Sequence, residues 1–473
     1  LMSQEKMFQQ ESFKPELLSP AGSLKNLRYA FAYGADAVYA GQPRYSLRVR
    51  NNEFDLEKLG IGINEAHELG KKLYVVSNIA PHNAKLKTYL QDLSPVIDLK
   101  PDAIIMSDPG LIMMVRDAFP EQQIHLSVQA NAVNWATVKF WQQQGISRVI
   151  LSRELSLDEI EEIRMKVPEM ELEVFVHGAL CMAYSGRCLL SGYMNKRDPN
   201  QGACTNACRW QYNAHEAKQD DVGQIIASNG TSLRVQESAV QIQEASAQIQ
   251  PPSDQLFLLQ EHGRPDEYMP AFEDEHGTYI MNSKDLRAIQ HVERLVKMGV
   301  HSLKIEGRTK SFYYCARTAQ IYRQAIDDAV AGKRFDKGLM SSLENLANRG
   351  YTDGFLQRHR HVDLQNYETG NSISEQQQFV GDVIETNGNS LTIDVKNRFS
   401  IGDSLELMTP KGNVTFLLAE LNDKHGRPID VAKGSGHVVS IPCPQGIDAS
   451  MGILLRNLQA GQTSRQPHAS ATA

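Results

Sequence analysis

Four cysteines near the middle of the chain have the clearest potential for chemistry. Cys181, Cys188, Cys204 and Cys208 lie in the segment HGALCMAYSGRCLLSGYMNKRDPNQGACTNACRW, residues 177–210, which directly follows a candidate strand. Four thiolates are the usual ligands of a 4Fe-4S cluster, whose sequence spacing is more varied than that of zinc sites with two tight knuckles. The spacing therefore favours a 4Fe-4S cluster, with structural zinc or unligated thiols as the alternatives.

The composition and charge limit where and how the protein acts. The sequence has 41% hydrophobic and 22% charged residues, and it has no apolar stretch long enough to cross a bilayer. The N-terminal residues also lack the apolar core of a signal peptide. We therefore expect a cytoplasmic protein without membrane contact. Thiols stay reduced in that compartment, so clustered cysteines indicate metal binding rather than disulfides. The net charge of -7 gives no global attraction for nucleic acid. Any RNA contact must therefore use local basic patches, such as residues 42–52 and 304–334. The alternative is that these residues are simply charged surface exposed to solvent.

The first two thirds of the chain alternate between apolar strand candidates and amphipathic helix candidates. The strands are predicted at 16–21, 37–41, 73–79, 103–108, 124–130, 148–153, 172–178, 278–283 and 302–307. The helices include 23–33, 56–69, 134–144, 157–165 and 284–298, and several end at a glycine, namely Gly34, Gly70, Gly145 and Gly299. This repeat predicts an α/β fold, an irregular TIM-like (β/α) barrel. Nine candidates exceed the eight strands of such a barrel, so one of them lies outside it or the barrel is irregular.

The remaining signals predict the domain organisation. From about residue 378 short alternating strands and turns predict a small C-terminal antiparallel β-barrel domain. The predicted parts are a disordered N-terminus (1–15), a barrel (16–340) containing a cluster loop (177–210) and a mobile polar insertion (211–275), a linker (341–377), the β domain (378–459) and a disordered tail (460–473).

Polar residues gather where the predicted barrel strands end. They are Ser19, Gln42, Asn78, Ser107, Asp108, Gln129, Asn131, Arg153, Glu154, His177, Asn282, Ser283, Glu306 and Arg308. Any one of them is more simply explained as a cap or loop group. Because the carboxyl ends of barrel strands meet at one face, the set together predicts a shared pocket there.

The cysteine segment also carries a resemblance to a known family. Its residues Glu173, Phe175, Gly178, Ala179, Leu180, Cys181, Gly186, Cys188, Leu190 and Ser191 stand at the spacings of the signature of the collagenase-like peptidase family of unassigned catalytic type. The resemblance extends over nearly the whole chain, including HLSVQANAVNW, NSKDL and SLKIEGRTKS. It is greatest for a bacterial branch that acts in tRNA hydroxylation.

The resemblance implies a function and a cofactor. Members of this branch help to form 5-hydroxyuridine at the wobble position of tRNA without oxygen, with prephenate as the proposed hydroxyl donor and a 4Fe-4S cluster. Carried over by residue, the cluster ligands are Cys181, Cys188, Cys204 and Cys208. Some relatives place a ligand cysteine where this chain has Arg287, so Cys208 is the ligand whose assignment departs from the family pattern.

Such a reaction also predicts roles for other residues. A dicarboxylate donor needs cationic groups, and a flipped base needs stacking surfaces and polar partners. We expect Arg44, Arg48, Gln129, Asn131, Arg153, Tyr184 and Arg187 to bind substrate, and His177, Glu306 and Arg308 to act in catalysis. Tyr39, Tyr45 and Trp210 are further candidates for stacking.

Two other functions remain open. A peptidase would use Cys181 or Cys188 with His177, although the sequence has no HExxH, no GxSxG and no recognisable triad order, and clustered thiols bind metals and cross-oxidise. The third possibility is a non-catalytic iron-sulfur scaffold that binds tRNA.

Overall fold

The computed structural model describes residues 13–41, 45–46, 53–79, 81, 83–179, 183–184, 187–188, 212–219, 225–234, 255–261, 268–274, 277–280, 285–346, 348, 350–357 and 377–458. The chain divides into two compact units. The first comprises Leu1–Gly178, Ala288–Ala347 and Ile373–Ala473, and the second comprises Ala179–Arg287 and Asn348–Ser372. The two ends predicted to be disordered lie almost entirely outside the described residues. Residues 358–376 of the predicted linker also lie outside them.

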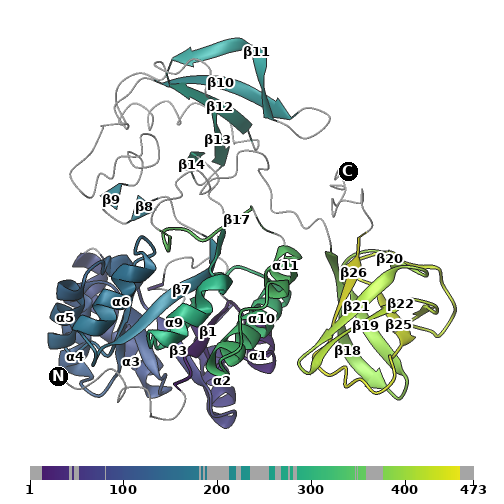
Figure 1. The fold of residues 1–473 in the computed structure, drawn as a ribbon, viewed down its shortest axis with the longest axis horizontal. Helices are drawn as coiled ribbons and strands as arrows, with labels where there is room; N and C mark the ends of the chain where they lie inside the picture. The colour runs from purple at the N-terminus through teal and green to yellow at the C-terminus, as the bar shows by residue number, and fades with distance from the viewer. Residues whose placement is uncertain are drawn as a thin grey trace. The chain divides into compact units, whose positions relative to one another are not determined.

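The first unit contains a closed barrel of eight parallel strands surrounded by helices (Figure 1). Its strands, in the order in which they pair, are β1 (Glu16–Ala21), β2 (Ala37–Gly41), β3 (Lys72–Val76), β4 (Ala103–Met106), β5 (Ile124–Leu126), β6 (Arg148–Ile150), β7 (Glu171–Ala179) and β16 (Ser302–Ile305). Pairing of β16 with both β7 and β1 closes the ring. The predicted TIM-like barrel is therefore confirmed, and its strands have the nearly continuous apolar character that burial on both faces requires.

The helices of this unit begin and end at residues that the sequence makes suitable. They are α1 (Leu24–Ala32), α2 (Leu56–Glu68), α3 (Asn83–Asp98), α4 (Pro109–Ala118), α5 (Trp135–Gln143), α6 (Leu157–Lys166), α9 (Val292–Lys297), α10 (Phe312–Val330) and α11 (Gly338–Glu344). The side chains of Ser23, Asp55, Asn134, Ser156 and Ser311 accept hydrogen bonds from the first turn of the helix that each precedes.

The glycines predicted to end helices do so. Gly34, Gly70, Gly145 and Gly299 have φ values of 108°, 65°, 76° and 78°, which lie in the left-handed region that favours glycine. The helix predicted over 284–298 is shorter than expected. The chain there forms β15 (Asp285–Arg287) and the 3₁₀ turn η7 (Ile289–His291) before α9 begins.

The second unit accounts for the surplus strand candidate. The segment predicted at 278–283 forms β14 (Gly277–Ile280), which pairs antiparallel with β13 (Tyr268–Asp274). Together with β10 (Tyr212–Gln219), β11 (Ile225–Arg234) and β12 (Gln255–Glu261) they form a five-stranded sheet in the order β11-β10-β12-β13-β14. The polar insertion predicted at 211–275 thus contains most of an antiparallel sheet, because short apolar runs such as QLFLLQE in β12 interrupt its polar sequence and favour strands. In the same unit β15 pairs in parallel with β17 (Tyr351–Thr352), which lies inside the predicted linker.

The C-terminal part of the first unit is an antiparallel β domain, as predicted. Its main sheet has the order β22-β21-β26-β18-β19-β25-β23 and a second pair joins β20 to β24. The bounds are β18 (Gln377–Asn387), β19 (Ser390–Val395), β20 (Phe399–Ser400), β21 (Ser404–Thr409), β22 (Gly412–Leu417), β23 (Asn422–Asp423), β24 (Val431–Ala432), β25 (Val438–Pro442) and β26 (Ile453–Asn457). Its core is apolar, with Leu391, Phe399, Leu405, Leu407 and Leu454 fully buried.

Candidate functional site

Charged side chains fill the inside of the barrel. We call Glu16, Arg148, Glu173 and Lys304 the charged column, because hydrogen bonds connect them along the barrel interior. Arg148 donates to Glu16 Oε1 at 2.6 Å and to Glu173 Oε2 at 3.4 Å, and Lys304 Nζ donates to Glu173 Oε1 at 2.8 Å. Barrels of this kind are usually filled by branched apolar side chains, so this interior is exceptional.

Neutral polar groups complete the lower end of the column. The hydroxyls of Tyr74 and Ser302 donate to the Glu16 carboxylate at 2.6 Å and 3.0 Å. The ring of His125 packs edge-on against Tyr74, with the ring centroids 4.7 Å apart. Glu16 therefore has hydrogen-bond donors on several sides, as a buried carboxylate needs.

Burial and neighbouring charges shift the pKa values of the column. Burial raises the pKa of Glu16, but the Arg148 guanidinium and the hydrogen bonds outweigh it, so the pKa ends below its ordinary value. Burial lowers the pKa of Lys304, against the opposing effect of the Glu173 carboxylate. Burial and the nearby cations Arg148 and Lys304 lower the pKa of His125 well below its usual range, so this imidazole is neutral near pH 7.

Above the column, at the carboxyl ends of the strands, Tyr39 and Glu306 meet. The Tyr39 hydroxyl donates to the Ile305 carbonyl at 2.9 Å and lies 3.3 Å from Glu306 Oε2. The backbone of Glu306 is also fixed, because its N-H donates to the His177 carbonyl at 2.8 Å and its carbonyl accepts from the Tyr314 hydroxyl at 2.7 Å. The predicted catalytic residue Glu306 is thus held in one place at the barrel mouth, by which we mean the face formed by the strand ends.

Two glycines permit close packing at the mouth. A Cβ atom on Gly41 would overlap the Arg308 guanidinium and would lie 2.7 Å from Ser46 Oγ. A Cβ atom on Gly178, whose φ is +106°, would lie 2.6 Å from the Glu306 carbonyl oxygen. At position 178 only glycine fits, because the obstacle is the Glu306 backbone, and this lets β7 approach Glu306. At position 41 the missing Cβ leaves the space that the Arg308 guanidinium occupies at the end of β2.

His177 lies behind the mouth rather than facing an open space. Its ring is 1% exposed, its Nδ1 is 3.3 Å from the Tyr322 hydroxyl, and its ring centroid is 5.9 Å from that of Tyr314. Both tyrosines belong to α10. The structure therefore places this predicted catalytic residue in the packing between β7 and α10, where it fixes the end of β7.

The predicted substrate-binding residues that the structure describes lie along the same edge. The Arg153 guanidinium stacks over the Phe175 ring, with Cζ 4.0 Å from the centroid. Gln129 lies in the middle of the 3₁₀ turn η3 (Val128–Ala130) after β5, and Asn131, which caps this turn with a φ of 54°, donates to the Gln129 carbonyl at 3.1 Å. In contrast Tyr45 is 1% exposed and packs edge-on against Tyr89 with its hydroxyl bonded to Asp92, so it is part of the core.

Other predicted site residues lie outside what the structure describes. These are Arg44, Arg48, Cys181, Cys204, Cys208, Gln42, Trp210, Asn282 and Ser283. Tyr184, Arg187 and Cys188 are described only by their backbone, as parts of the strands β8 (Ala183–Tyr184) and β9 (Arg187–Cys188), where Ala183 pairs with Cys188.

The described cysteines outside that segment are not reactive sites. Cys315 is fully buried, and burial raises its pKa to about 12. Burial also raises the pKa of Cys443. Among the described residues, no three His, Cys, Asp or Glu side chains come together as a metal site. The four thiols between residues 181 and 208 have the chemistry of a metal site, because four thiolates are the donor set that a 4Fe-4S cluster or a zinc ion takes.

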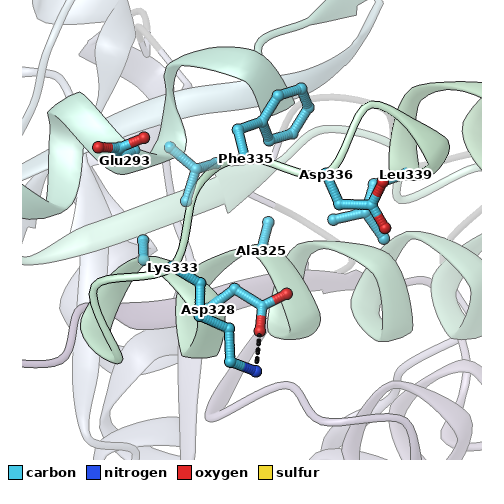
Figure 2. Close-up of a pocket in the computed structure, with 9 residues that line it drawn as sticks. Glu293, Ala325, Asp328, Lys333, Phe335, Asp336 and Leu339 are labelled. Atoms are coloured by element: carbon cyan, nitrogen blue, oxygen red, sulfur yellow. Dashed lines mark hydrogen bonds and ion pairs between the residues drawn. The ribbon is translucent and has the colours of Figure 1, made fainter.

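A small pocket on the outside of the barrel is separate from the mouth. Its lining residues come from α9, α10, α11 and the connection after α10: Val292, Glu293, Ala325, Asp328, Ala329, Lys333, Phe335, Asp336 and Leu339 (Figure 2). Asp328 forms an ion pair of 2.8 Å with Lys333 there, and Glu293 pairs with Lys297, so Asp336 adds a further negative charge to the lining. Such a lining does not suit an anionic ligand.

No helix among the described residues is long and apolar enough to span a membrane.

The sequence predictions did not include the charged column. Its signal was present as charged residues at every second position of an otherwise apolar strand, as in Glu171 and Glu173 of β7. Period-two alternation usually marks a solvent-facing side, whereas in a closed barrel the same period marks the interior.

Comparisons with known proteins agree with this architecture. The pattern of peptidase family U32 matches residues 22–366, and that of the peptidase family U32 C-terminal domain matches residues 375–456. The chain is 68% identical over 457 residues to tRNA hydroxylation protein P of Escherichia coli and 64% identical over 458 residues to that of Haemophilus influenzae, covering 96% of this chain and 99% of each relative. It is 27% identical over 414 residues to the 23S rRNA 5-hydroxycytidine C2501 synthase of Escherichia coli, covering 86% of this chain and 54% of that protein. The chain belongs to peptidase family U32.

Proposed function

We propose that this protein is a tRNA hydroxylase that forms 5-hydroxyuridine at the wobble position, with prephenate as the hydroxyl donor and a 4Fe-4S cluster on Cys181, Cys188, Cys204 and Cys208. The observation that carries the proposal is the 68% identity, over 96% of the chain, to a protein named for tRNA hydroxylation. The more distant relative named as a 5-hydroxycytidine synthase supports the same class of reaction, addition of a hydroxyl group to a pyrimidine of RNA.

The chemistry sets requirements for the site. Replacing the C5 hydrogen of uracil by a hydroxyl group at the oxidation level of water releases two electrons and one proton per hydroxide consumed, so the proposal includes an external redox carrier that takes up both electrons, one at a time. When bound, a 4Fe-4S cluster supplies one-electron transfer. The protein must in addition hold the base and the donor together, accept the proton and exclude water.

The barrel mouth offers groups for these tasks. Arg308, lying over Gly41, and Arg153, stacked on Phe175, are cations suited to the carboxylates of the donor. Glu306, positioned by Tyr39, is the group that we assign to accept the C5 proton. We assign contacts with the RNA to Arg44, Arg48, Gln129, Asn131, Tyr184 and Arg187, and a positioning role to His177.

Mass spectrometry of tRNA nucleosides from a deletion strain tests the proposal. The strain should lose 5-hydroxyuridine, and a plasmid with the wild-type gene should restore it. A plasmid with Glu306→Gln should not restore it. Glu65→Gln removes a partly exposed carboxylate on α2 that pairs with Arg28, and it should restore 5-hydroxyuridine fully. Undiminished 5-hydroxyuridine in the deletion strain, with any redundant pathway also removed, would end the proposal.

A second experiment separates the alternatives. Protein purified without oxygen should be brown and contain iron and sulfide near four per chain. A colourless zinc protein would contradict the cluster. Peptide cleavage that survives removal of iron would favour a peptidase, and tRNA binding by wild-type protein without modification would favour a scaffold.

A further inference from the structure

We propose that Lys304 and Glu173 are positioning residues of the barrel mouth, a buried ion pair that fixes the rings supporting Glu306 and Arg153. This inference rests on the proposed function and extends it to residues inside the barrel. Neither residue reaches the mouth itself, since Lys304 is 4% exposed and Glu173 is fully buried.

Lys304 lies between two aromatic rings. Its Nζ is 4.3 Å from the centroid of Tyr39 and 5.4 Å from that of Phe175, both within the range of cation-π attraction. Each ring in turn contacts one charged group of the mouth. The Tyr39 hydroxyl lies 3.3 Å from Glu306 Oε2, and the Phe175 ring carries the Arg153 guanidinium at 4.0 Å. One ammonium group thus holds the supports of both a proposed proton acceptor and a proposed donor-binding cation.

Glu173 serves Lys304 rather than the rest of the charged column. Arg148 already has short contacts with Glu16 at 2.6 Å and Glu171 at 2.8 Å, and its contact with Glu173 is longer, at 3.4 Å. The short bond of Glu173 is the one to Lys304, at 2.8 Å. The pair can therefore be removed together without leaving Arg148 unpaired.

Stability alone does not account for such a pair. Taking two ions out of water costs several kcal/mol each, and replacing a buried pair by apolar residues of similar volume is often neutral or stabilising. The protein nevertheless has an ion pair directly beneath the mouth, where apolar side chains would fill the space equally well. A role in holding Tyr39 and Phe175 gives the charge a reason to be there.

The double variant Glu173→Met/Lys304→Met separates position from stability. It keeps the volume, removes both charges, and should unfold at a temperature close to that of the wild type. In the deletion strain, at equal protein level, it should lower the 5-hydroxyuridine content at least about tenfold because the supports of Glu306 and Arg153 lose their fixed charge. The affinity of the purified protein for tRNA should stay unchanged, since no residue that contacts RNA is altered.

Lys71→Met is the matched control. Lys71 is also a partly buried lysine over a ring, with Nζ 5.1 Å from the centroid of Phe31, but it precedes β3 at the opposite end of the barrel. This variant should restore wild-type 5-hydroxyuridine levels.

Each outcome is decisive. A double variant that is stable and fully active overturns the positioning role and leaves the proposed function intact. If the double variant does not fold, Lys304→Met and Glu173→Gln are compared per folded protein at low temperature, and wild-type activity in both overturns the role. If none of the three variants folds, the ion pair is needed for folding, and this result also overturns the positioning role. If the wild-type gene itself restores no 5-hydroxyuridine, the proposed function fails and this inference falls with it.

Discussion

The C-terminal β domain and the barrel contain very different interiors. In the β domain, Leu391, Leu407 and Leu454 are fully buried among other aliphatic and aromatic side chains. In the barrel, Glu173 and Lys304 are buried to a similar depth but are held by hydrogen bonds and an ion pair. Both arrangements exclude water.

The difference indicates what each region is selected for. An apolar core depends on volume and shape, tolerates conservative exchange and responds little to pH. A buried ionic network is sensitive to the loss of a single partner and gives fixed directions to the groups above it. We therefore associate the charged interior with the barrel mouth and the apolar interior with stability alone.

Arg148→Met should have the largest effect on stability. It leaves Glu16 without its main partner, so we expect the free energy of unfolding of the barrel to fall by about 3–5 kcal/mol. Denaturant unfolding followed by circular dichroism measures this. The same substitution at Arg28, half exposed and paired with Glu65, should change the free energy of unfolding by less than about 1 kcal/mol. Equal effects at both positions would remove the distinction between the two kinds of interior.

Leu407→Ala tests the apolar side of the comparison. Truncation of this fully buried side chain should lower the free energy of unfolding of the β domain by about 2–5 kcal/mol through lost transfer energy and a cavity. The loss should be the same at pH 5 and pH 8, because no titratable group is involved. A strong pH dependence would show that the β domain also relies on charge.

Gly41→Ala should disturb the mouth without weakening either core. The added methyl group overlaps the Arg308 guanidinium and must displace it, so 5-hydroxyuridine formation should fall about tenfold, equivalent to about 1.4 kcal/mol. Gly41 does not have a positive φ, so its substitution tests the overlap alone, whereas Gly70→Ala would add its Cβ in open space at a φ of 65° and shows the effect of backbone strain without an overlap. Nucleoside mass spectrometry measures the loss of 5-hydroxyuridine in both variants, and thermal unfolding measures their loss of stability. If Gly41→Ala had wild-type activity, Arg308 would have no role in the reaction.

His301→Asn should give the smallest change, visible only as a pH dependence. Burial, with Arg164 nearby, lowers the pKa of His301 to about 4, and its Nδ1 accepts a hydrogen bond from the Leu172 N-H at 3.2 Å. Its folded-state pKa lies below the unfolded value near 6.5, so its contribution to stability is complete above that value and declines as the pH falls toward 4. The variant should show a shallower loss of stability between pH 6.5 and pH 4 in thermal unfolding, and the remaining slope should come from His125 and, toward pH 4, from carboxylates such as Glu16 whose pKa is also lowered. An unchanged slope would contradict this assignment.

The barrel was predictable because its signals are local. A buried parallel strand is apolar along its length, and a helix that ends at Gly34 or Gly145 needs a left-handed residue at that place. The partner of a strand is not a local property. The segment at 278–283 therefore resembled a barrel strand, although its described part, residues 278–280, pairs antiparallel with β13.

The site was predictable in part for a related reason. Glu306, Arg308 and Arg153 follow strands, and the rule that strand ends form the site located them. His177 follows the same rule, but α10 covers it, and the sequence does not say which helix packs on which strand end. Lys304 within β16 was not recognised because a charged residue in a strand is usually solvent-facing.

The Ala288 N-H donates to the Val176 carbonyl at 2.8 Å, so the chain returns to the barrel beside the point at which it leaves it after Gly178. Segments whose two ends adjoin on a rigid scaffold can be lengthened, shortened or exchanged at little entropic cost to the rest of the fold. The described ends of this excursion are therefore anchored side by side on the barrel. Evolution could exchange the excursion while the barrel stays as it is, and a protein engineer could graft the excursion of one relative onto the barrel of another.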